Sequence, residues 1–208
     1  MGISERKVRA KEELRQTIID AALKIFVAEG YEKTSLRNIA ESIEYSPGTI
    51  YLHFKDKDEL LFAVHEVAFT KFFVAMSPVL LIADTRQRLL QMGQLYIQFA
   101  FENPELYGLM FMDKAPMNCL EQSNDAWICG QKAHNLLRNT MIEHLTKEGF
   151  NEMEIDVYTM SIWSYVHGLT SLAIRDRFSI MKERAYNMDE MIQKSLEMMV
   201  DKILPKQI

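Results

Sequence analysis

Apolar residues recur at helical spacing along nearly the whole chain, and polar capping residues separate the segments. Leu14, Ile18, Ala22 and Ile25 mark one face of the first helix, and Gly30 follows where a helix end favours a positive φ. Further along, Ser, Asp and Asn precede apolar runs as N-caps, and Pro or Gly follows them. The pattern predicts an all-α protein of about nine helices, with no credible hairpin and no repeat.

Two short helices are expected after the first one. Thr34 is the expected N-cap of a helix that buries its apolar side. Ser46 is the expected N-cap of the next, with Pro47 at its first position and an end near Phe54. The remaining helices are expected at about 57–76, 84–102, 103–112, 122–148, 151–178 and 187–204.

The two short helices and the tight turn between them form a helix-turn-helix candidate. A recognition helix is short and presents small polar residues at its N-terminus, so that backbone and side chains reach base edges in the major groove. Pro47, Gly48 and Thr49 meet this requirement. Thr49 offers a hydroxyl and a methyl, which suit a phosphate or a thymine methyl.

The flanking residues suit the DNA backbone. Tyr51 and His53 follow one turn later, where phosphates would lie. Lys57 stands at the N-terminus of the next helix, whose dipole also attracts a phosphate. The candidate DNA-contacting residues are Thr34, Ser35, Arg37, Ser46, Pro47, Gly48, Thr49, Tyr51, His53 and Lys57.

The stretches Gly30–Ala40 (GYEKTSLRNIA) and Ser46–Leu61 (SPGTIYLHFKDKDELL) resemble the TetR family of bacterial transcriptional regulators. The resemblance implies an N-terminal three-helix DNA-binding domain, here residues 1–56. It also implies a C-terminal helical domain for effector binding and dimerisation, here residues 57–208. It places six residues at positions that commonly contact DNA: Thr34, Arg37, Thr49, Tyr51, His53 and Lys57.

The turn before the recognition helix departs from the family pattern. Family members usually have Ala/Leu-Gly-Val-Ser there, whereas this chain has Ile43-Glu44-Tyr45-Ser46. Glycine is favoured where φ is positive, so Glu44 at that position costs about 1 kcal/mol. Its carboxylate also brings negative charge near DNA, and we expect a slightly altered turn.

A second, shorter resemblance lies in the C-terminal half. Trp163–Leu169 (WSYVHGL) looks like the Trp…His-Gly signature of one TetR C-terminal subgroup, and Leu109–Met112 fits the short helix of that subgroup.

Charge is distributed unevenly along the 208 residues, whose net charge is −5. Residues 1–57 hold ten Lys/Arg and nine Asp/Glu, a net of +1, and residues 58–208 hold fourteen and twenty, a net of −6. The first eleven residues carry Glu5 and four basic residues: Arg6, Lys7, Arg9 and Lys11. This asymmetry suits a DNA-contacting part with a basic N-terminal tail on a larger acidic part, although a solvated tail without a partner has the same composition.

Aromatic, Met and His residues of the C-terminal part suggest an effector pocket. The candidate ligand-binding residues are Met92, Tyr96, Phe99, Phe111, Trp127, His134, Trp163 and His167. Tyr96, His134 and His167 would be the polar anchors of a largely apolar effector. The alternative is ordinary core packing, which such residues also serve.

Other chemistries find no support in the sequence. No His among His53, His65, His134, His144 and His167 has a second His or a Cys at i+3 or i+4, so no metal site is expected. Acidic neighbours make Cys119 and Cys129 poor oxidant sensors. Catalytic motifs, a membrane-spanning run and a secretion signal are missing, which predicts a cytoplasmic protein that is not an enzyme and uses no cofactor.

The last two helices carry broad apolar stripes, and two such helices from each of two subunits can pack as a four-helix bundle. The stripes are Ile155, Tyr158, Ile162, Val166 and Leu169 in one helix, and Met188, Met191, Ile192, Leu196, Met199 and Ile203 in the other. Burial of both stripes within one chain is the alternative, and the family resemblance favours the homodimer.

Together these features predict a homodimeric, ligand-responsive transcriptional regulator. We expect a repressor that binds a near-palindromic double-stranded operator and is released by a small, largely apolar effector. The competing hypothesis is a helical small-molecule sensor or carrier whose DNA-binding head is weakened, and Glu44 is the feature that favours it.

Overall fold

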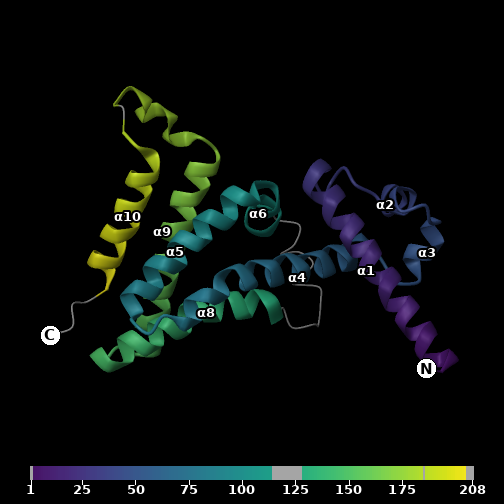
Figure 1. Ribbon diagram of the computed structural model, residues 1–208, viewed down its shortest axis with the longest axis horizontal. Helices are drawn as coiled ribbons and strands as arrows, with labels where there is room; N and C mark the ends of the chain where they lie inside the picture. Colours follow the sequence, from purple (N-terminus) through teal and green to yellow (C-terminus); the bar gives the residue numbers. More distant parts are fainter. Residues whose placement is uncertain (1, 114–127, 185, 205–208) are drawn as a thin grey trace. The chain divides into compact units, whose positions relative to one another are not determined.

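The computed structural model describes residues 2–113, 128–184 and 186–204. Within these ranges the chain is all α, with nine α-helices and no strand (Figure 1), which confirms the predicted fold class. The helices are α1 (Ile3–Glu29), α2 (Leu36–Ser42), α3 (Pro47–Tyr51), α4 (Lys57–Met76), α5 (Thr85–Glu102), α6 (Pro104–Phe111), α8 (Ile128–Leu145), α9 (Glu152–Ile174) and α10 (Met188–Ile203). Short 3-10 segments follow α4, α8 and α9 at Ser77–Leu81, Thr146–Glu148 and Arg177–Arg184.

Local capping chemistry sets most helix starts where the sequence predicts them. The side chains of Ser46, Asp84, Asn151 and Asn187 each accept a hydrogen bond from the backbone N–H three residues later. Gly30 has a φ of 84° at the end of α1, a conformation that glycine adopts without steric cost.

Three boundaries differ from the prediction. Ser35, not Thr34, is the N-cap of α2, because its side chain accepts the N–H of Asn38. The third helix ends at Tyr51 rather than near Phe54. α9 ends at Ile174 rather than near residue 178, because the backbone changes at Asp176, whose φ is 50°. The start of the predicted helix 122–148 lies outside the described residues, which resume at Ile128.

The basic N-terminal segment is helical and is not a loose tail. α1 begins at Ile3, so Arg6, Lys7, Arg9 and Lys11 belong to its first turns. Because a helix separates neighbouring residues onto different faces, these charges have defined directions.

The chain divides into two compact units, and α4 contributes to both. The described parts of Met1–Phe69 and Glu105–Ile128 form the N-terminal unit, and those of Thr70–Pro104 and Cys129–Ile208 form the C-terminal unit. The boundary after residue 56 that the sequence suggests therefore falls inside the N-terminal unit, since the first half of α4 packs there.

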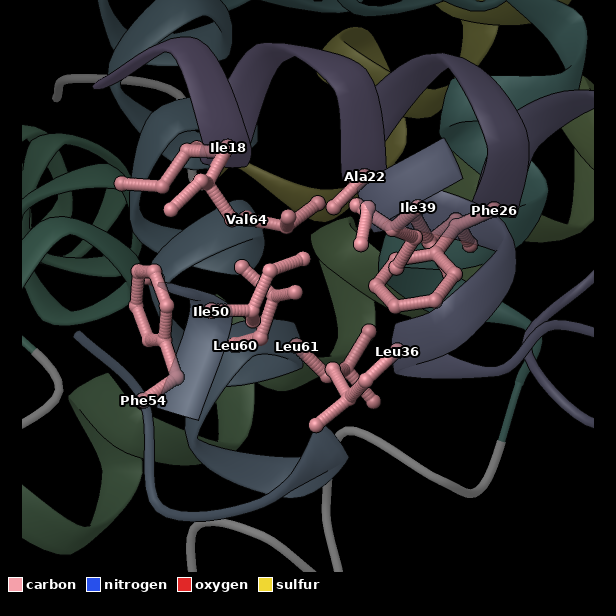
Figure 2. Packing of buried hydrophobic residues seen from close by; sticks show 14 residues of the cluster. Ile18, Ala22, Phe26, Leu36, Ile39, Ile50, Phe54, Leu60, Leu61 and Val64 are labelled. Carbon is pink, nitrogen blue, oxygen red and sulfur yellow. The ribbon is translucent and has the colours of Figure 1, made fainter. Parts of the chain in front are cut away.

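The core of the N-terminal unit joins α1, α2, α3 and α4 (Figure 2). Its labelled members are Ile18, Ala22, Phe26, Leu36, Ile39, Ile50, Phe54, Leu60, Leu61 and Val64, all nearly inaccessible to solvent. Leu109 of α6 belongs to the same cluster. Burying each large apolar side chain contributes about 1.5–3 kcal/mol, which holds the short α2 and α3 in place.

In the C-terminal unit, α5 packs against α9 and α10, and α9 packs against α10. Gly93 of α5 allows a close approach, because a Cβ there would lie 3.0 Å from Cδ2 of Leu196 on α10. Arg88 Nη1 pairs with Glu143 Oε2 at 2.6 Å and links α5 to α8. Side-chain packing therefore contributes most to the stability of this unit, because a partly exposed ion pair such as Arg88–Glu143 adds little.

Candidate DNA-binding surface and effector residues

The helix-turn-helix is built from α2, the turn Ile43–Ser46 and α3. α2 buries Leu36, Ile39 and Ala40 in the core. α3 buries only Ile50, and Phe54 anchors the chain just after it (Figure 2). With one fully buried residue in five, most of the surface of α3 remains accessible to solvent.

Glu44 keeps the left-handed conformation that the turn requires. Its φ is 60°, and its N–H donates to the carbonyl of Glu41 at 3.2 Å. The next N–H, of Tyr45, donates to the carbonyl of Ala40 at 2.9 Å. The turn is therefore closed by backbone hydrogen bonds, and the glutamate bears the conformational cost that glycine avoids.

The outward side of α3 is small and polar at its start. Ser46 and Gly48 are exposed, and Pro47 and Thr49 are partly buried. Ser46 Oγ accepts the N–H of Thr49 at 3.3 Å and lies 3.0 Å from Thr49 Oγ1. This side chain pair rigidifies the N-terminus of α3 while leaving it accessible.

Two larger side chains extend the same surface. Tyr51 is 58% exposed and Leu52 is 75% exposed. The sequence interpretation included Tyr51 and omitted Leu52, although its i+3 spacing from Thr49 on a helix pointed to the same face.

Residues Ser35 and Arg37 lie on the exposed side of α2. Ser35 caps the helix and also hydrogen-bonds the side chain of Asn38. Arg37 Nε donates to Glu41 Oε1 at 2.8 Å, and this carboxylate raises the pKa of the guanidinium. A phosphate would have to compete with Glu41 for Arg37.

The side chains of Thr34 and Lys57 form hydrogen bonds within the N-terminal unit. Thr34 is 3% exposed, and its hydroxyl donates to the carbonyl of Gly30 at 2.9 Å. Lys57 Nζ donates to the carbonyls of Tyr31 at 3.0 Å and Thr34 at 3.1 Å. It also lies 3.9 Å from the centre of the Tyr31 ring, and the Tyr31 hydroxyl bonds Asp58.

His53 follows the end of α3 and lies near the positive charges of Lys11 and Arg15. Partial burial lowers its pKa most, and the charges of Lys11 and Arg15 lower the pKa further, whereas Glu12 raises it. Its Nδ1 is buried with no hydrogen-bond partner among the described residues. The Arg15 guanidinium stands 4.9 Å from the centre of the Phe54 ring. The sequence interpretation did not bring α1 and His53 together.

Two of the candidate effector residues form a hydrogen-bonded pair in the C-terminal unit. Tyr96 of α5 and His167 of α9 meet with the hydroxyl 3.1 Å from Nδ1. Tyr96 is buried and packs edge-on against Phe72, with ring centres 5.5 Å apart. Burial lowers the pKa of His167, so the neutral imidazole is favoured there. Met92 and Phe99 of α5 are buried in the same unit.

The other candidates are divided among different surroundings. His134 and Trp163 form an edge-to-face pair with ring centres 6.3 Å apart, and both are exposed. Phe111 belongs to the N-terminal unit, where it contacts Phe69 and Tyr107. Trp127 lies outside the described residues, as does Cys119. The eight candidates thus do not form one described cluster.

Two features of the described residues bear on the requirements of a metal site and of a membrane span. They contain no group of three or more His, Cys, Asp or Glu side chains able to hold a metal ion. One helical stretch, Lys57–Leu81, is long and apolar enough to cross a bilayer by length and composition alone. Half of the tested window is buried inside the protein, as is usual for the core helix of a globular protein.

The apolar stripes expected at a dimer interface pack mostly within the chain. Ile155, Ile162 and Val166 of α9 are buried, as are Ile192, Leu196 and Met199 of α10. A different face of α9 exposes Met153, Val157, Met160, Trp163 and Leu172. Periodicity found an apolar face on α9 but could not show that the helix has two.

Comparison with known proteins gives two family matches. Residues 18–64 match the model described as bacterial regulatory proteins, tetR family. Residues 89–201, more than half of the chain, match the model described as tetracyclin repressor-like, C-terminal domain.

Individual relatives agree with these matches. The HTH-type transcriptional regulator SrpR of Pseudomonas putida is 48% identical over 60 residues, which cover 28% of each chain. A HTH-type transcriptional regulator of Staphylococcus aureus is 30% identical over 115 residues, 55% of this chain and 57% of the relative. The first curated relatives are matched over only about a quarter of their length.

A solved structure extends the fold likeness to nearly the whole chain. The transcriptional regulator FadR of Bacillus subtilis, crystallised in complex with stearoyl-CoA, has a TM-score of 0.65 at 17% identity. The alignment covers 89% of this chain and 97% of FadR. On its two domain matches, the chain belongs to the TetR family of bacterial regulatory proteins.

Proposed function

We propose that this protein is a transcriptional regulator that binds double-stranded DNA through α3. The observation that carries the proposal is the burial pattern of α3. Ile50 is the one buried residue of α3, whereas Ser46, Gly48 and Tyr51 are exposed and Thr49 is partly exposed on a helix capped by Ser46. This is the form that reads base edges in the major groove. DNA recognition is assigned to residues 1–56, and effector binding and dimerisation to residues 57–208.

The active species is proposed to be a homodimer formed through α9 and α10. Support comes from the exposed apolar face of α9, on which Met153, Val157 and Met160 follow one another at i, i+4 and i+7. Met198 of α10 is exposed as well. Two-fold symmetry would place two α3 helices one DNA turn apart, about 34–36 Å, on a near-palindromic operator.

The effector is proposed to be a small, largely apolar molecule bound in the C-terminal unit. Tyr96 and His167 would supply the polar anchor, because they form a hydrogen-bonded pair and Tyr96 packs against the ring of Phe72. A ligand that bonds either group gains specificity, while burial of its apolar part supplies affinity.

Regulation is proposed to act through α4, the helix shared by both units. An effector that binds one arrangement of the dimer more tightly shifts the population toward that arrangement. If the favoured arrangement separates the two α3 helices wrongly for DNA, the protein leaves its operator. The protein would then act as a cytoplasmic repressor.

A sensor or carrier with a weakened DNA-binding head is the second candidate. Glu44 favours it, since an exposed carboxylate stands in the turn beside α3. The internal hydrogen bonds of Lys57 favour it as well, because they occupy a cation that would otherwise meet a phosphate.

Selection of bound sequences from a random duplex pool at two salt concentrations separates the candidates. Enrichment of a two-fold-symmetric site is the expected result. Binding without enrichment, lost steeply as salt rises, would mean phosphate contacts alone and would overturn the proposal. Absence of binding at low salt would favour the sensor.

Substitutions in α3 test whether this helix contacts the DNA. Thr49→Ala and Tyr51→Ala are expected to weaken binding to the selected site about tenfold each, the effect of losing one contact of about 1–2 kcal/mol. Tyr186→Ala is the matched control, because Tyr186 is an exposed tyrosine of the C-terminal unit. Equal affinities for all three variants would remove α3 from the interface.

A further inference from the structure

The inward-facing side of α1 changes from apolar to basic along the helix. Ile18 and Ala22 on this side are buried in the core. Lys7, Lys11 and Arg15 continue the same side toward the N-terminus at i, i+4 and i+8. In Figure 1 the N-terminal turns of α1 extend past α3. A basic side at this place faces the surroundings of α3 instead of the core.

Two contacts locate this side beside the end of α3. The guanidinium of Arg15 stands 4.9 Å from the centre of the Phe54 ring. Lys11 and Arg15 are also near enough to His53 to lower its pKa, after the larger effect of partial burial. Glu12 is the acidic neighbour that acts on His53 in the opposite direction.

The cations of this side lack carboxylate partners. Lys7, Lys11 and Arg15 form no ion pair within the part of the chain that the structure describes. Arg9 points to the other side of α1, where its Nε pairs with Glu13 Oε1 at 2.7 Å. Like charges on one side of a helix repel one another, and an external anion bound there would relieve this repulsion.

We propose that Lys7, Lys11 and Arg15 form a basic face on α1 that binds the phosphate backbone next to the base pairs contacted by α3. The inference rests on the proposed DNA-binding function and adds a second contact surface to it. The surface is a helical extension whose cations would contact phosphates without reading sequence.

The test is the salt dependence of binding to a short random-sequence duplex, because phosphate contacts do not depend on sequence. The double variant Lys7→Gln/Lys11→Gln removes two exposed charges, and Arg15 stays because it packs on Phe54. Each lost phosphate contact lowers the slope of log K against log salt by about 0.9, or about 3.6 for a dimer that loses two contacts per protomer.

The matched control is Arg9→Gln/Lys24→Gln, which removes the same charge from the opposite side of α1. A reduced slope in the first double variant and an unchanged slope in the control supports the proposal. An equal reduction in both would mean a diffuse field, and no reduction would mean no contact; either result overturns it. If the unmodified protein binds no duplex even at low salt, the proposed function itself fails.

Discussion

Lys57 at the start of α4 contacts Tyr31 in the loop after α1 through both its ring and its backbone carbonyl. The ammonium lies 3.9 Å from the centre of the tyrosine ring and donates to the Tyr31 carbonyl at 3.0 Å. It also donates to the carbonyl of Thr34 at 3.1 Å, while the Tyr31 hydroxyl bonds Asp58. A lysine that is expected to meet a phosphate therefore closes the α1–α2 loop onto α4.

Lys57→Met is expected to lower the free energy of unfolding by about 1–2 kcal/mol. It keeps most of the apolar stem but removes hydrogen bonds from a charged donor to two carbonyls. The measurement is the urea or thermal unfolding curve. Lys55→Gln is the control, since Lys55 is an exposed lysine two residues earlier. A Lys57→Met protein of unchanged stability, with a reduced salt slope for DNA binding, would restore the phosphate role.

The variants Glu44→Gly and Glu44→Gln separate the backbone strain at Glu44 from the effect of its negative charge on DNA binding. Glycine relieves about 1 kcal/mol of left-handed strain and loses part of it to a more flexible unfolded chain, so a gain of about 0.5 kcal/mol is expected. Glutamine keeps the strain and removes only the charge. Both variants are expected to bind duplex DNA more tightly, because each removes a carboxylate beside α3. Unfolding curves and binding isotherms check the pair, and a less stable Glu44→Gly protein would contradict the strain.

The buried His65 predicts a loss of stability at mildly acidic pH. Its Nε2 lies 3.2 Å from the Leu109 carbonyl, and burial lowers its pKa in the folded state. The unfolded chain, with a histidine pKa of about 6.5, then binds the proton more readily. This contribution is complete above about pH 6.5 and is lost as the pH falls toward the folded-state pKa.

Melting temperatures across this pH range test the assignment. His65→Asn keeps a donor for the Leu109 carbonyl but does not titrate. The variant is less stable than the unmodified protein at neutral pH, and its stability is expected to decline less on acidification. Parallel pH profiles for the two proteins would show that His65 does not carry the effect.

Met160→Glu is expected to convert the proposed dimer into folded monomers. Met160 is 59% exposed on α9, so a charge there leaves the core of one protomer intact but is costly in an apolar interface. Sedimentation or light scattering gives the mass, and circular dichroism confirms the helices. Val74→Glu, at an exposed apolar residue of α4, is the control. A dimer that survives Met160→Glu would place the interface elsewhere.

Local interactions allowed much of the fold to be predicted from sequence. The caps Ser46, Asp84, Asn151 and Asn187 act over three residues, so their roles follow from neighbouring side chains alone. The positive φ at Glu44 was likewise expected, because the family that the sequence resembles usually has glycine at this position of the turn.

The surface of α3 was also predictable, whereas the neighbours of α1 were not. Ile50 is the one apolar side chain in the middle of a short polar helix, so its inward direction follows from the pattern. Lys7, Lys11 and Arg15 recur at four-residue spacing, but the sequence interpretation described a basic N-terminal tail and not a basic side of a helix. The place of this basic side beside His53 depends on how the core packs α1 against α3.

By itself, the sequence determined the all-α class, most helix starts and the helix-turn-helix, because periodicity and capping operate within one or two helical turns. Only the tertiary structure decided that Lys57 bonds carbonyls, that Tyr96 meets His167, and that Ile162 is buried while Met160 is exposed. Such contacts join residues far apart in the chain. The spacing of apolar residues shows that one face of a helix is apolar, but the residues that cover this face depend on tertiary packing.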